Sequence, residues 1–123
     1  MNKLICLLLV LTPALASADK NLTSGASWDC KKDPVVSLGN GKLKIKFTGT
    51  CTTINVGSGE NTLDIESVDT LNVGGGKNKI TIGTVDTIHL GGAKNVVRWK
   101  KAKTGDKPTI QDGAAGNDVA QAK

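Results

Sequence analysis

Aromatic side chains are scarce in this sequence, which has no tyrosine, one phenylalanine and two tryptophans among its 123 residues. The three aromatic residues are Trp28, Phe47 and Trp99. Proteins that bind single-stranded nucleic acid stack bases on aromatic rings, and sugars are held in a similar way. The short supply counts against both kinds of stacking platform, and we expect no nucleic-acid partner.

Motifs that carry chemistry are also lacking. The single histidine, His89, has no serine or aspartate partner evident in the sequence, although a general base needs a partner within hydrogen-bond reach. There is no nucleophile elbow, no phosphate-binding loop and no metal-ligand cluster. The sequence therefore predicts that the protein is not an enzyme and uses no cofactor and no metal.

The only long apolar run stands at the start of the chain, from Leu4 to Leu11, and small residues follow at Ala16 and Ala18. This pattern is typical of a secretory signal peptide, and the run is too short to span a membrane comfortably. We predict a signal peptide over residues 1–18, with cleavage after Ala18 or, as the alternative, after Ala16. The protein is then secreted or periplasmic, with no transmembrane segment after cleavage.

Two cysteines, Cys30 and Cys51, remain beyond that segment. An even pair in an exported chain indicates a disulfide. The rival interpretation, a zinc site, lacks ligands because two thiolates and one histidine do not complete a closed site. We predict a Cys30–Cys51 disulfide, which closes a loop of about 20 residues and contributes about 3 kcal/mol in the chain-entropy model.

Helical periodicity is absent beyond the first segment, and a fixed repeat is present instead. Three units begin at Ile54, Leu71 and Ile88, each 17 residues after the one before, with glycine and asparagine recurring at the same positions. A short fixed period predicts stacked coils, and alternating apolar residues such as Ile54 and Val56 indicate strands. The predicted fold is all-β: a short single-stack parallel β-solenoid (β-helix) of about four coils, which we expect to be right-handed.

The remaining segments are predicted from their composition. Residues 19–35 form an extended segment before the solenoid, which covers residues 36–104. Residues 105–123 have almost no bulky apolar side chains and are predicted to be a disordered tail. In the irregular first coil, a shorter loop is expected to place Leu43 and Ile45 in the columns of Leu63 and Ile65, respectively.

Glycine and asparagine mark the predicted turns. A glycine follows the first strand of each unit, where we expect positive φ as the backbone turns the corner. The asparagines four residues later tolerate turns and form a ladder when stacked. The structural turn positions are Gly57, Asn61, Gly74, Asn78, Gly91 and Asn95.

Basic residues form a candidate anion-binding stripe. The formal net charge is +5, and the predicted signal peptide accounts for one of these charges. The stripe consists of Lys42, Lys44, Lys46, Lys79, Arg98 and Lys100. The alternative is an ion-pair ladder in which Lys44 lies over Asp64 and Lys46 over Glu66, with modest attraction.

Asp69 and Asp86 share one predicted column at the second corner of the coil. Two stacked carboxylates suit a cation such as calcium. Aspartate is also a common turn residue that bonds nearby backbone amides. We adopt this structural interpretation and keep calcium as the alternative.

A family resemblance follows from these features. Cys30, a second cysteine at 51, and units of the form V-x-V-x-G-x-x-N-x-V over residues 28–101 resemble the bacterial family catalogued as domain of unknown function three-zero-six-zero. The resemblance implies a secreted or envelope-associated protein with the predicted fold, and it carries no catalytic residue across. We expect an exported, non-catalytic structural or binding module of the periplasm or cell surface. The alternative is a binder of anionic envelope polysaccharide or of lipid headgroups.

Overall fold

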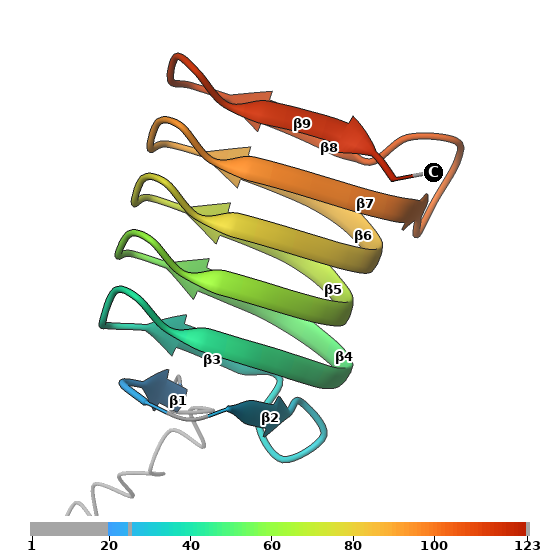
Figure 1. The fold of residues 1–123 in the computed structure, drawn as a ribbon. Helices are drawn as coiled ribbons and strands as arrows, with labels where there is room; N and C mark the ends of the chain where they lie inside the picture. Colours follow the sequence, from blue (N-terminus) through green and yellow to red (C-terminus); the bar gives the residue numbers. More distant parts are fainter. Residues whose placement is uncertain (1–19, 25, 123) are drawn as a thin grey trace, which may run out of the picture.

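The computed structural model describes residues 20–24 and 26–122, so the predicted signal peptide lies outside the described residues. This part of the chain consists of β-strands joined by turns (Figure 1). None of its elements is a helix of the length and apolarity needed to cross a membrane. The strands are β1 (Lys20–Leu22), β2 (Ser27–Asp29), β3 (Val35–Leu38), β4 (Lys44–Val56), β5 (Thr62–Val73), β6 (Lys79–Leu90), β7 (Val96–Ala102), β8 (Thr109–Asp112) and β9 (Asp118–Gln121).

The strands stack as successive turns of one coil (Figure 1). Every strand pairing is parallel, and β4, β5 and β6 are joined in register, so that Ile54 lies beside Leu71 and Leu71 beside Ile88. Each of these long strands bends around a corner and supplies two sides of its coil, while a short loop closes the circuit. The predicted parallel β-solenoid is confirmed, with about five turns in place of about four.

The core is a set of apolar columns inside the coil. Ile54, Leu71 and Ile88 have no exposed surface, and the other inward columns are equally well buried. Each buried aliphatic side chain contributes about 1.5–3 kcal/mol through the area that it removes from water. Alternation along each strand leaves the side chains between them outside, and these outward positions build the surfaces described below.

The register of the first coil differs from the sequence-based prediction. Ile45 pairs with Leu63 and Phe47 with Ile65, so the predicted partners were displaced by two residues. The loop after Leu38 therefore has the same length as its counterparts, and the irregularity lies further along the strand.

That irregularity is a β-bulge at Gly49. The register shifts between Phe47 and Thr50, and Gly49 between them has a φ of 76°. Glycine adopts this left-handed backbone without steric cost. Its N–H donates to the Glu66 carboxylate of the next coil at 2.8 Å. The extra residue of the first coil is thus absorbed in the bulge and not in the loop.

The disulfide joins Cys30 to Cys51 across 21 residues of sequence, and both cysteines are buried. Cys51 lies in β4, just after the bulge, and Cys30 follows directly after β2. The bond therefore fastens the segment that precedes the solenoid to the corner of its first complete coil.

The predicted disordered tail is corrected by a further coil. β8 pairs with β6 and β9 with β7. Ile110 lies beside Ile88, a separation of 22 residues in place of 17. Extra residues at the preceding corner break the fixed period, which is why the repeat could not be recognised there. The side chain of Pro108, unlike those around it, is buried.

In three successive loops a buried asparagine accepts a backbone N–H of the coil before it. Asn61, Asn78 and Asn95 are at most 1% exposed. The Oδ1 of Asn78 accepts the backbone N–H of Asn61 at 2.9 Å, and the Oδ1 of Asn95 accepts that of Asn78 at 3.0 Å. Asn117 continues the series by accepting the N–H of Asn95 at 2.8 Å. We call this series the asparagine ladder; it supplies the partners that buried loop amides require.

The positive φ predicted for the turn glycines is wrong. None of Gly57, Gly74 and Gly91 has it, and a Cβ added to any of them would meet only ordinary contacts at 3.8–3.9 Å. The left-handed backbone lies three residues further along each loop, directly before the asparagine ladder. The turn is completed there because the asparagine must point inward to bond the neighbouring coil.

We predict that Asn78→Ala lowers the free energy of unfolding by about 1–3 kcal/mol, because it leaves the buried N–H of Asn61 without an acceptor,. Urea denaturation measures the loss. Asn55→Ala is the matched control: Asn55 is a half-exposed asparagine on the outer surface, and we expect it to cost less than about 1 kcal/mol. Equal losses in the two variants would contradict the structural role of the ladder.

We also predict slow hydrogen exchange in the last coil. The N–H groups of Asp118 and Ala122 donate to the carbonyls of Asn95 and Trp99 at 2.8 and 2.7 Å. Their exchange should be slower than that of the exposed residues 105–107, measured by NMR or mass spectrometry on the whole chain. Uniformly fast exchange from residue 105 onward would contradict the ordered last coil and support the disordered tail that the sequence predicted.

Candidate anion-binding surface

One residue in each short loop has an unusual backbone; it precedes a ladder asparagine in the later coils and Leu43 in the first. Lys42, Glu60, Lys77 and Lys94 have φ values of 59°, 61°, 60° and 61°. All four are exposed, and we call them the loop-edge column. In the last coil the same position is Gly116, with a φ of 78°. The column follows the edge on which the short loops turn, at the left of Figure 1.

An open groove of about 580 Å³ runs along this column. Beside the four column residues it is lined by Gly41, Gly59, Gly76 and Ala93. A Cβ on Gly41 would lie 2.6 Å from the carbonyl oxygen of Gly59, and one on Gly59 would lie 2.7 Å from that of Gly76. Larger residues are therefore excluded from these two positions, and the chain keeps a bare backbone between its charged side chains.

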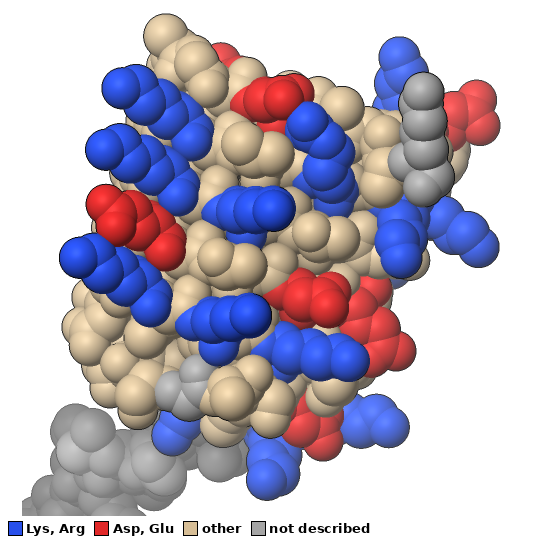
Figure 2. All heavy atoms as spheres, viewed as in Figure 1, with Lys and Arg blue, Asp and Glu red and all other residues tan. Residues whose placement is uncertain are grey.

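Two further lysines stand beside the column. Lys44 and Lys79 begin β4 and β6, and the register places them in one outward column with Thr62 between them. Both are exposed. We call the combined surface the basic edge: Lys42, Lys44, Lys77, Lys79 and Lys94. Figure 2 shows basic side chains gathered on this side of the molecule, in a row that an acidic residue interrupts at the loops.

The basic edge contains only part of the predicted stripe. Lys42, Lys44 and Lys79 belong to it, whereas Lys46, Arg98 and Lys100 lie further across the strands. Lys46 pairs with Asp64 in the register, and Lys100 lines a second hollow together with Asp64 and Glu66. The acids of the second coil thus divide the predicted stripe.

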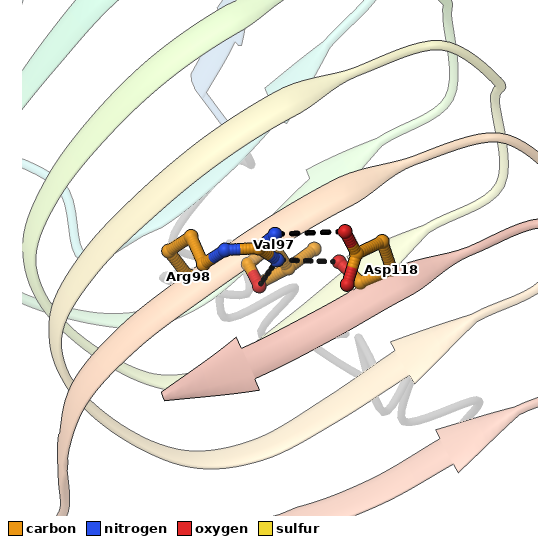
Figure 3. A network of polar contacts seen from close by, with 3 residues as sticks. All are labelled: Val97, Arg98 and Asp118. Carbon is orange, nitrogen blue, oxygen red and sulfur yellow. Dashed lines mark hydrogen bonds and ion pairs between the residues drawn. The ribbon is translucent and has the colours of Figure 1, made fainter. Parts of the chain in front are cut away.

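Arg98 binds a neighbouring coil of its own chain. Its Nη2 lies 2.7 Å from the Asp118 carboxylate, and its Nη1 donates to the carbonyls of Asp118 and Val97 (Figure 3). The hydrogen bond with Asp118 raises the pKa of Arg98 and lowers the pKa of Asp118. Because both groups are exposed, the pair contributes little to stability, but it removes Arg98 from the candidate site.

The predicted ion-pair ladder is wrong in its partners. Lys44 lies beside Thr62, and Lys46 lies beside Asp64. Glu66 accepts the N–H of Gly49. Within the described ranges the ion pairs are Arg98–Asp118 and Lys103–Asp69. The correction follows from the register of the first coil, which was displaced by two residues in the prediction.

The two stacked aspartates of the second corner have partners within the chain. Asp69 forms its ion pair with Lys103, and Asp86 accepts a hydrogen bond from the Thr104 hydroxyl at 3.0 Å. No cluster of three or more histidine, cysteine or acidic residues occurs in the part of the chain that the structure describes. The arrangement fastens the corner before the last coil to the coils beneath it.

Sequence reasoning missed Lys77 and Lys94. The prediction used strand alternation to choose outward residues, and these two lysines lie in loops. The available signal was their place directly before Asn78 and Asn95, in the position that Lys42 and Glu60 also occupy relative to the loop. Alternation does not apply across a turn, so only the loop register could reveal the column.

The far side of the coil carries a different surface. Its outward columns contain hydroxyl, amide and imidazole groups, among them those of Thr70, Asn72 and His89. The segments 53–58, 70–75 and 87–92 contain no Lys, Arg, Asp or Glu. Asn72 donates to the Asn55 side chain at 2.9 Å. The face formed by these segments is therefore uncharged, and the charged side chains of these coils lie on the loop edge, on the other strand face and at the second corner.

Comparison with known proteins finds one similarity, to a family of sequences. Residues 59–116 match the sequence model described as "Protein of unknown function (DUF3060)", a range that begins after Cys51 and runs from the loop of one coil to that of the last. The comparisons with curated proteins and with solved structures found no match. The matched range covers the stacked coils that carry most of the loop-edge column, and the match supports the resemblance to the DUF3060 family.

Proposed function

We propose that this protein is an exported, non-catalytic binding module that holds an anionic polymer of the cell envelope on its basic edge. The observation that carries the proposal is the set of lysines on one edge, none of which forms an ion pair in residues 20–24 and 26–122. Glu60 is the one acid of the loop-edge column. Clustered charge of one sign raises the local concentration of oppositely charged ligands.

The spacing of the lysines suits a polymer. Successive coils are about 4.8 Å apart, so the basic edge repeats its charges along the solenoid axis at multiples of that distance. A chain of regularly spaced carboxylates or phosphates can contact several lysines at once. Lipid headgroups fit less well, because the large exposed apolar side chains among the described residues are only Val96 and Ile110, and interfacial binding gains much of its strength from buried apolar area.

Export is the second part of the proposal. The Cys30–Cys51 disulfide is compatible with an oxidising, extracellular location,. The first 18 residues have the charge, apolar core and small residues of a signal peptide. Outside the cytoplasm the ligands available to the basic edge include the acidic polymers of the envelope.

We predict salt-dependent retention on a resin that carries polygalacturonate, a linear acidic glycan. The protein should bind at about 20 mM salt and elute well below about 1 M, because exposed charges are screened over a few ångströms at that ionic strength. An uncharged dextran resin is the control. Absence of retention, or retention that ignores salt, would refute the proposal.

We further predict that cells expressing the full chain release a processed, oxidised protein from the periplasm or into the medium. N-terminal sequencing should begin at Asp19 for cleavage after Ala18, or at Ser17 for cleavage after Ala16. Mass spectrometry without reductant should find Cys30 linked to Cys51. An unprocessed chain confined to the cytoplasm would contradict export.

A further inference from the structure

We infer that the polymer binds along the loop-edge column, in the open groove beside it. The ligand is a linear polyanion that lies parallel to the solenoid axis and contacts the ammonium groups of Lys42, Lys77 and Lys94. The inference rests on the proposed function and assigns it a site and a ligand shape. Three features of the column carry it: its backbone conformation, its stacked charges and its groove.

The backbone conformation is unfavourable for lysine. A residue with a Cβ costs about 1–2 kcal/mol in the left-handed region, whereas glycine enters it freely. The last coil shows that the fold accepts glycine there, since Gly116 has a φ of 78° at the same position. Folding alone would favour glycine in every coil. The three lysines are therefore retained against a conformational cost.

The stacking of charge is a second cost at the same positions. Lys77 and Lys94 lie in adjacent coils, and the N–H of Lys77 donates to the carbonyl of Ala93, directly before Lys94. Like charges in neighbouring rungs destabilise a sheet. Backbone strain that coincides with a further unfavourable feature is characteristic of functional sites. A bound anion would offset the repulsion between the lysines, and binding it would account for lysine at these strained positions.

The groove gives the ligand its shape and direction. From Lys42 to Lys94 the column crosses three coil spacings, about 14 Å along the axis. Between the lysines the lining is Gly41, Gly59, Gly76 and Ala93, so a polymer backbone can approach the protein backbone closely. Lysine is a flexible point charge that does not select planar groups. The ligand class is therefore a linear polymer of repeated anions, of carboxylate or phosphate type.

The test compares two triple variants that remove the same charge. K42G/K77G/K94G replaces the column lysines with the residue that the backbone prefers. K46Q/K100Q/K101Q removes three exposed strand lysines outside the basic edge. Affinity is measured for polygalacturonate and for inorganic polyphosphate over a range of salt concentrations, and each variant is also melted to report its stability.

The column variant should bind at least about tenfold more weakly than the wild type, with a salt dependence reduced by about two units of slope, as expected for three lost contacts to a single-stranded polyanion. Its melting temperature should equal or exceed that of the wild type, because glycine relieves the strain. The affinity of the strand variant should be less than about threefold weaker than that of the wild type. The relative affinity for the two polymers identifies carboxylate or phosphate as the preferred anion.

A gain of binding provides a test that does not depend on loss. Glu60→Gln removes the acid within the column and should strengthen binding to both polymers by about threefold or more. Thr70→Lys is its control, because it changes the net charge by the same amount on the uncharged face. Equal gains in both variants would show a general charge effect and overturn the assignment of the site.

The remaining outcomes separate the inference from the proposed function. If the wild type binds and neither triple variant loses affinity, the inference fails, and the proposed function stands with Lys44 and Lys79 as the remaining lysines of the basic edge. If only the strand variant loses affinity, the polymer binds outside the basic edge, and both the inference and the proposed site fail. If the wild type binds neither polymer, both fail. A column variant that melts well below the wild type would show that the lysines serve the fold, and would overturn the inference.

Discussion

The asparagine ladder is the interaction on which the architecture depends. A solenoid of such short coils must turn its backbone sharply, and the amides of the turns face a core that offers them no water. Asn61, Asn78 and Asn95 solve this by accepting N–H groups of the coil before them. Each side chain thereby joins two coils and fixes their alignment. Apolar columns alone would tolerate sliding, whereas a buried amide without its partner costs about 1–3 kcal/mol.

The ladder also creates the candidate site. For the asparagine to point inward, the residue before it adopts the left-handed backbone, and its side chain is then exposed at the edge. The position is repeated in every coil: it precedes a ladder asparagine from the second coil onward, and in the first coil Lys42, which precedes Leu43, has the same backbone. One structural requirement therefore generates an aligned series of exposed side chains, and the choice of lysine at Lys42, Lys77 and Lys94 gives that series its charge. The uncharged opposite face shows that this choice is local.

The sequence predicted what its period determines and missed what interrupts that period. The inward columns of the regular coils follow from 17-residue spacing and strand alternation. The register of the first coil was not predicted correctly, because the sequence does not show whether an extra residue lies in a loop or in a bulge. The structure places it in the bulge at Gly49. The last coil escaped because its insertion lies at a corner, although G-A-A-G-N at residues 113–117 repeats the loop pattern. Lys77 and Lys94 were not predicted as part of the candidate site, because strand alternation does not continue into the loops where they lie.

The stacking of identical coils has an evolutionary consequence. Each coil contacts only its neighbours, and the stability of such repeat proteins is nearly a sum over repeats and their interfaces. An in-frame duplication of one unit would leave the existing coils intact and lengthen the lysine row by about 4.8 Å. Each duplication would thus add one more contact to a long polymer and raise the avidity by one step. It would need no new fold and no change to an existing contact.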